Sequence, residues 1–127
     1  MFKIEALDHV ALSVRDVERS AQWYADVLGF KRLHEGMWDG VPIFVGNGAA
    51  AIALFPARDK GVSTSHDRAA VRTLHFAFRA NRENFLHAQD ELKKRAILFD
   101  FQDHEISHSI YFRDLDGHEI EITTYEL

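Results

Sequence analysis

An internal repeat constrains this chain more than any other feature, because one pattern of strands and helix occurs twice. Each copy begins with a strand that carries a histidine, His9 in the first and His75 in the second. A helical segment and three short strands follow in each copy. The copies span about residues 5–56 and 72–125, and the pattern predicts two tandem βαβββ modules of the α+β class.

Capping residues and turn signals mark the elements of each module. Asp16 and Asn81 are good N-caps for the two expected helices, and Gly29 is a good stop for the first helix. The dipeptide Asn47-Gly48 is a strong two-residue hairpin signal. Strands are expected at residues 5–14, 30–35, 41–46, 49–56, 72–80, 97–102, 107–113 and 118–125.

Strand alternation predicts where three candidate metal ligands point. Successive side chains in a strand face opposite sides of the sheet, so His9 and His75 fall on the smaller, less apolar side of their strands. Glu121 likewise avoids the side taken by Ile120 and Ile122. Since the chain has no cysteine, any metal must bind nitrogen and oxygen atoms, and His9, His75 and Glu121 are the candidate ligands.

The repeat is asymmetric in these ligands. Laying one module over the other places His9 on His75 and Glu121 near Ala53, so only three of four equivalent positions carry a ligand. Three protein ligands leave coordination positions open for substrate, water or dioxygen. Fe(II) suits such a site best, while Mn(II), Ni(II), Co(II) and Zn(II) are also compatible.

Tyr111 is a candidate catalytic residue because of the last hairpin. A three-residue turn at 115–117 pairs Asp114 with His118 and sets Tyr111 directly across from Glu121. Its phenol could donate a proton or a hydrogen bond to a bound oxyanion, although a purely packing role is equally compatible with the pattern.

Phe44 is a candidate for lining a substrate pocket. The Asn47-Gly48 turn would place Phe44 opposite Ala51. The alternative is a core position, which is the commoner place for an aromatic residue in a strand.

Length and charge exclude several classes of protein. A chain of 127 residues is expected to form a single domain, with residues 57–71 as a linker between the modules. The net charge of −5 without a basic cluster argues against nucleic acid as a partner. No apolar run is long enough for a membrane span, so a cytoplasmic protein is expected.

Three segments resemble the vicinal oxygen chelate superfamily, which includes glyoxalase I, extradiol dioxygenases, fosfomycin-resistance enzymes and bleomycin-binding proteins. They are Asp-His-Val-Ala-Leu at 8–12, Leu-His-Phe-Ala-Phe at 74–78 and the closing motif Ile-Tyr-Phe-Arg-Asp-Leu-Asp-Gly-His-Glu-Ile-Glu-Ile at 110–122. The resemblance implies a curved mixed sheet around a divalent metal, with the helices outside, usually in a homodimer. It also implies His9, His75 and Glu121 as ligands, in agreement with the alternation of the strands.

Differences between this sequence and the patterns of the other subfamilies favour the extradiol dioxygenases. Glyoxalase I normally carries a glutamate where Ala53 stands. Fosfomycin-modifying enzymes tend to have threonine at the position of Ala11, and they tend to have a basic C-terminal segment, whereas this sequence ends at Leu127 soon after Glu121. Bleomycin-binding relatives generally lack the metal ligands. A tyrosine ten residues before the glutamate, as Tyr111 precedes Glu121, is similar to the extradiol dioxygenases.

The expected function is therefore that of a metal-dependent enzyme whose small substrate chelates the metal through adjacent oxygens, with a dioxygenase favoured. His66 and His104 are the candidates for an additional catalytic histidine. A lyase, an isomerase or a resistance-type transferase could use the same site. The other class that the sequence leaves open is a small-molecule or drug-binding protein without turnover.

Overall fold

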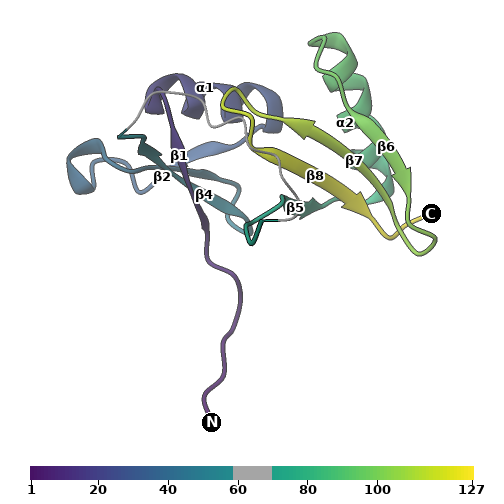
Figure 1. Cartoon of the computed structure of the whole chain (residues 1–127), viewed down its shortest axis with the longest axis horizontal. Coiled ribbons are helices and arrows are strands. Elements are labelled where there is room, and N and C mark those ends of the chain that lie inside the picture. The colour runs from purple at the N-terminus through teal and green to yellow at the C-terminus, as the bar shows by residue number, and fades with distance from the viewer. Residues whose placement is uncertain (59–69) are drawn as a thin grey trace. The chain divides into compact units, whose positions relative to one another are not determined.

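The structure, a computed structural model, describes residues 1–58 and 70–127. The chain divides into two compact units, Met1–Gly61 and Val62–Leu127. Within the described residues each unit contains one α-helix and one four-stranded mixed sheet (Figure 1). The predicted α+β fold of two tandem βαβββ modules is confirmed, whereas a single domain over residues 1–127 stays a prediction.

The first unit has the strand order β1-β4-β3-β2, with β1 parallel to β4 and the other neighbours antiparallel. Helix α1 packs on β3 and β4. A short 3-10 turn, η1, lies between β2 and β3. The bounds are β1 Val10–Val14, α1 Val17–Leu28, β2 Lys31–Leu33, η1 Trp38–Gly40, β3 Ile43–Gly46 and β4 Ala51–Pro56.

The second unit repeats this topology with the order β5-β8-β7-β6, in which β5 is parallel to β8. Helix α2 packs on β8. The bounds are β5 Phe76–Arg79, α2 Arg82–Lys94, β6 Asp100–Asp103, β7 His108–Arg113 and β8 Glu119–Thr124. The same strand order in both units means that each position of one module has a structural counterpart in the other.

The helix boundaries lie where the capping residues predicted them. The Asp16 carboxylate accepts a hydrogen bond from the Arg19 amide at 3.1 Å, and Asn81 accepts one from the Asn84 amide at 2.8 Å. Gly29 ends α1 in the left-handed conformation, with φ at 69°. These side chains satisfy amides that the first helical turn leaves without partners, which fixes where each helix starts.

Each sheet buries one apolar face under its helix, and the candidate site residues lie on the opposite face. In the first unit Ile52 and Leu54 are fully buried together with Tyr24 of α1. In the second unit Ile120 and Ile122 of β8 take the corresponding positions, and Ile110 of β7 is fully buried beside them. Since side chains alternate along a strand, the neighbours of these core residues, including the candidate site residues, point to the other side.

The hairpin between β3 and β4 is wider than the Asn47-Gly48 signal predicts, which corrects the expected register. The Asn47 side chain accepts hydrogen bonds from the amides of Ala49 at 3.2 Å and Ala50 at 3.0 Å. These bonds stabilise a loop of residues 47–50 in place of a two-residue turn. Phe44 consequently pairs with Ala53 and not with Ala51.

Gly46 lies at the start of this loop, where the chain allows no side chain. A Cβ atom built on Gly46 would collide with the backbone oxygen of Ala50 and lie 3.0 Å from the Cα atom of Ala51. Gly46→Ala should therefore lower the free energy of unfolding by about 2 kcal/mol, as overpacking against backbone usually does. Urea unfolding measures this loss. The exposed control Ala49→Ser should change stability by less than about 0.5 kcal/mol, and an equally stable Gly46→Ala protein would contradict the close approach.

The observed strands are shorter than the expected ranges, mainly at their N-terminal ends. Pairing of β1 starts at Val10 and pairing of β5 at Phe76, so His9 and His75 directly precede their strands. Residues 59–69 of the predicted linker, with His66, lie outside the described residues. Among the helices of the described part, none is both long and apolar enough to cross a membrane.

Candidate metal centre

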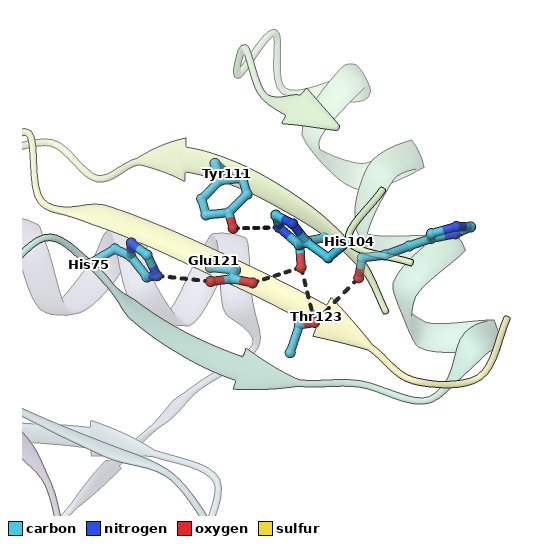
Figure 2. A network of polar contacts seen from close by, with 7 residues as sticks. His75, His104, Tyr111, Glu121 and Thr123 are labelled. Carbon is cyan, nitrogen blue, oxygen red and sulfur yellow. Dashed lines mark hydrogen bonds and ion pairs between the residues drawn. The ribbon is translucent and has the colours of Figure 1, made fainter. Parts of the chain in front are cut away.

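Two of the three predicted ligands meet in the second unit. His75 Nε2 lies 2.9 Å from Glu121 Oε1 (Figure 2). Glu121 stands in the middle of β8 and is only 9% exposed, while His75 lies just before the adjacent strand β5. A buried carboxylate needs a charged or hydrogen-bonded partner, and His75 is one such partner.

A buried hydroxyl holds the other oxygen of this carboxylate. Ser109 Oγ on β7 donates to Glu121 Oε2 at 2.7 Å, and Thr123 Oγ1 lies 3.0 Å from Ser109 Oγ (Figure 2). The Thr123 hydroxyl in turn donates to the His108 carbonyl oxygen at 3.4 Å, so a short chain of hydrogen bonds runs from Glu121 through both hydroxyls to the backbone of β7. This pair of hydroxyls leaves Oε1 of Glu121 facing His75.

The donor atoms of this pair fit a divalent metal ion. Two ligand atoms that each lie about 2.1 Å from one ion at a right angle are separated by about 3 Å, close to the observed separation of His75 Nε2 and Glu121 Oε1. His75 Nδ1 is buried and has no hydrogen-bond partner among the described residues. A buried ring nitrogen without a partner is typical of a place where water is held, and this nitrogen is not the one that faces Glu121.

In the first unit, the predicted ligand His9 has a carboxylate neighbour. Its Nδ1 lies 2.7 Å from Asp8 Oδ2. A carboxylate on Nδ1 favours the tautomer whose proton is on that nitrogen, and this leaves the lone pair on Nε2 for a metal. The sequence interpretation missed Asp8, although a carboxylate next to a candidate histidine is a readable signal.

Each unit places a histidine, an aromatic residue and the strand partner of that aromatic residue in the same arrangement. The His9 ring meets Phe44 edge-on with centroids 5.0 Å apart, and the His75 ring meets Tyr111 edge-on at 5.5 Å. The two aromatic residues hold equivalent places, since Phe44 pairs with Ala53 and Tyr111 pairs with Glu121. The predicted correspondence of Glu121 with Ala53 thus holds in the strand register.

Within residues 70–127, His75 and Glu121 have no third histidine or carboxylate placed to complete a metal site. His9 belongs to the other unit, so a centre of three ligands is still a prediction. The observed register nevertheless makes His9 the counterpart of His75, because Ala11 pairs with Ala53 as Ala77 pairs with Glu121.

Tyr111 has the placement that the hairpin turn predicts. It is paired with Glu121 across β7 and β8, and its ring contacts His75. Burial raises the pKa of the Tyr111 phenol above its usual 10.0, and the negative charge of Glu121 raises it further. The phenol therefore keeps its proton throughout the neutral pH range and is available as a donor.

Phe44 lies in a cluster of rings that covers the His9 side of the first sheet. Its ring centroid is 5.3 Å from that of His34 and 5.3 Å from that of Trp38. Trp38 is 49% exposed, and its backbone lies in the left-handed region with φ at 54°. A half-exposed indole on a strained loop is a feature more typical of a binding surface than of a core.

Of the two further histidine candidates, His104 reaches the site and His66 lies outside the described residues. His104 Nε2 is 2.9 Å from the Tyr111 hydroxyl oxygen (Figure 2). Ser109 is a second residue that the sequence interpretation missed. Alternation could have found it, because Ser109 stands two residues before Tyr111 and hence on the same side of β7.

Removal of the Ser109 hydroxyl should weaken the site. In Ser109→Ala the buried Glu121 Oε2 loses its donor, which should cost about 1–3 kcal/mol of stability and about tenfold in affinity for a divalent ion. Urea unfolding and metal titration measure the two effects. Ser107→Ala, a change at another buried serine, should leave metal affinity within about twofold; equal losses in both variants would show that the effect is not specific to Glu121.

Comparisons with known proteins agree on one family. The family model described as Glyoxalase/Bleomycin resistance protein/Dioxygenase superfamily matches residues 6–122. The chain is 29% identical to Metallothiol transferase FosB of Staphylococcus epidermidis, over 98% of this chain and 86% of that protein. It is 25% identical to Glutathione transferase FosA of Serratia marcescens, over 94% of this chain and 80% of that protein. The solved glyoxylase/bleomycin resistance protein/dioxygenase domain from Frankia sp. EAN1pec matches with a TM-score of 0.74 and 26% identity, over 96% of this chain and 93% of that one.

Proposed function

Since this chain belongs to the glyoxalase/bleomycin resistance protein/dioxygenase superfamily, we propose that it is a metal-dependent enzyme whose small substrate binds through adjacent oxygen atoms. The resemblance to the vicinal oxygen chelate superfamily is thereby confirmed. In the proposal His9, His75 and Glu121 hold one divalent ion. The observation that carries it is the 2.9 Å separation of His75 Nε2 from the buried Glu121 Oε1. In the first unit His9 is the counterpart of His75.

The protein's own groups have distinct tasks in this proposal. When bound, the divalent ion supplies Lewis-acid polarisation of the substrate oxygens. Ser109 keeps the Glu121 carboxylate oriented, and Tyr111 donates its phenol proton or a hydrogen bond to an oxygen that gains negative charge. Phe44, whose ring contacts those of His9 and Trp38, lines the substrate site.

The reaction type that the relatives favour is group transfer. Two similar curated proteins are named as a metallothiol transferase and a glutathione transferase, so we place transfer of a thiol ahead of the dioxygenase that the sequence favoured. In such a step the thiolate sulfur bonds to an electrophilic carbon, the bond from that carbon to oxygen breaks, and the Tyr111 proton neutralises the released oxygen. The absence of threonine at position 11, where Ala11 stands, is a weaker argument than these similarities.

Ring cleavage with dioxygen is the second candidate. It is favoured by Tyr111 ten residues before Glu121 and by the contact of Tyr111 with a histidine, His104. Fe(II) belongs to this second candidate because oxygen activation needs a redox-active metal. Thiol transfer requires only a Lewis acid, for which Mn(II), Ni(II), Co(II) or Zn(II) would serve with the same donors. A homodimer in the cytoplasm completes the proposal.

The experiment that tests the proposal combines metal and substrate panels. Protein stripped of metal is reloaded with one divalent ion at a time and assayed for loss of glutathione thiol in the presence of fosfomycin, and for oxygen uptake with catechol. Metal-dependent thiol loss would support group transfer, and metal-dependent oxygen uptake would support ring cleavage. Tight binding of these compounds that survives chelation, without turnover, would instead indicate a binding protein.

A further inference from the structure

His104 is an exposed residue whose ring is held against the candidate site. It lies in the turn between β6 and β7, where its amide donates to the Ser107 carbonyl at 2.8 Å. The next residue, Glu105, is in the left-handed region with φ at 71°, and its amide is bound by the Asp103 carboxylate at 2.8 Å. These hydrogen bonds hold the backbone of the turn from which the His104 side chain extends.

The contact with Tyr111 is a defined hydrogen bond. His104 Nε2 and the Tyr111 hydroxyl oxygen are 2.9 Å apart, and the two rings meet edge-on at an angle of 89°. Figure 2 shows the phenol oxygen directed to the imidazole, while Glu121 is engaged by His75 and by a hydroxyl of the β7 strand. Tyr111 thus stands between an imidazole and a carboxylate.

A phenol has only one proton to donate, so these two neighbours compete for it. The ionised Glu121 can only accept, whereas a neutral imidazole can accept through its unprotonated nitrogen. A phenol that donated to Glu121 would occupy carboxylate lone pairs that a metal ion needs. The neighbour that accepts the hydrogen bond of the phenol therefore decides how many lone pairs of Glu121 remain for a metal ion.

We propose that His104 is a positioning residue: its Nε2 accepts a hydrogen bond from the Tyr111 hydroxyl and so draws the phenol proton away from Glu121. Glu121 is then left to its metal, and the Tyr111 hydroxyl is held in one orientation until a substrate oxygen takes its hydrogen bond in exchange for His104. This inference rests on the proposed function in so far as it concerns metal affinity. The orientation of the Tyr111 proton itself does not depend on any metal.

Two replacements of His104 separate positioning from bulk. A glutamine amide extends about as far as imidazole Nε2 and can accept the phenol proton, while asparagine is one methylene shorter and cannot reach Tyr111. His104→Asn should weaken Mn(II) or Zn(II) binding about tenfold, and His104→Gln should stay within about twofold of wild type. His87→Asn, on the exposed side of α2, is the matched control and should change nothing.

A double-mutant cycle assigns the effect to Tyr111. In a Tyr111→Phe background, where no phenol proton exists, His104→Asn should no longer alter metal affinity. Equal losses with glutamine and asparagine, or a loss that persists without the phenol, would overturn the proposal. Thermal unfolding of each variant identifies any loss that comes from misfolding.

A second measurement needs no metal. The ¹⁵N shifts of the His104 ring in the metal-free protein report which nitrogen carries the proton, and we expect an unprotonated, hydrogen-bonded Nε2 that changes in Tyr111→Phe. Unchanged ring shifts in that variant would overturn the inference. If the wild-type protein binds no divalent ion, the proposed function fails, and these spectra still decide whether His104 orients Tyr111.

Discussion

Glu121→Gln should lose tight binding of a divalent ion while keeping its fold. The amide has nearly the same shape as the carboxylate and can still accept the hydrogen bond from Ser109, but it is neutral and a much poorer metal ligand. We expect the dissociation constant for Mn(II) or Zn(II) to rise by about two orders of magnitude or more, because even loss of an outer-shell partner costs 10- to 100-fold. Metal titration of the metal-free protein measures this.

Glu119→Gln is the control for this prediction. Glu119 is two residues earlier on β8, so its side chain is on the same side of the strand, yet it pairs with Arg113 and not with Tyr111. The control should bind metal as the wild type does. A Glu121→Gln protein with unchanged affinity would remove Glu121 from the ligand set.

Tyr111→Phe should lower turnover far more than metal affinity. The change removes a single hydroxyl that faces the site, and loss of a general acid typically costs about 100-fold or more in kcat. The dissociation constant of the metal should stay within about threefold, since phenylalanine preserves the ring contact with His75. Steady-state kinetics with whichever substrate the metal-dependent assay identifies, together with metal titration, separate the two effects.

The pH dependence provides a second readout for Tyr111. Its pKa is raised by burial and by Glu121, so the protonated phenol persists to pH values above 10.0. A step that needs this proton should fail only beyond that pH, and Tyr111→Phe should lack this alkaline limb. Tyr125→Phe, at an exposed tyrosine, is the control and should retain it. Equal kcat in Tyr111→Phe and wild type would limit Tyr111 to packing.

Local signals in the sequence predicted much of the fold. Asp16 and Asn81 cap the helices because their side chains bind amides only three residues away, and such short-range geometry is readable from sequence. The pairing of Tyr111 with Glu121 was predictable for the same reason, since a tight turn fixes the register of the strands it joins. The repeat then extended these local predictions to both modules.

The features that were missed depend on side chains that alter a loop. Asn47 binds two amides of its own hairpin, which widens the turn and changes the partner of Phe44 from Ala51 to Ala53. His104 lies in a turn whose next residue, Glu105, is left-handed, and nothing in residue spacing encodes this turn or the contact of His104 with Tyr111. The proposed convergence of His9 with the second module depends on how distant segments pack, and alternation along a strand carries no information about that packing.

The central claim is that imidazoles from both modules and one carboxylate bind a single ion, and His9→Ala tests it most directly. Equilibrium dialysis against Zn(II) or Mn(II) gives the number of bound ions per chain and their affinity. We expect one ion per wild-type chain and an affinity at least about 100-fold lower in His9→Ala, as in His75→Ala. A His9→Ala protein that binds one ion per chain with wild-type affinity would contradict it.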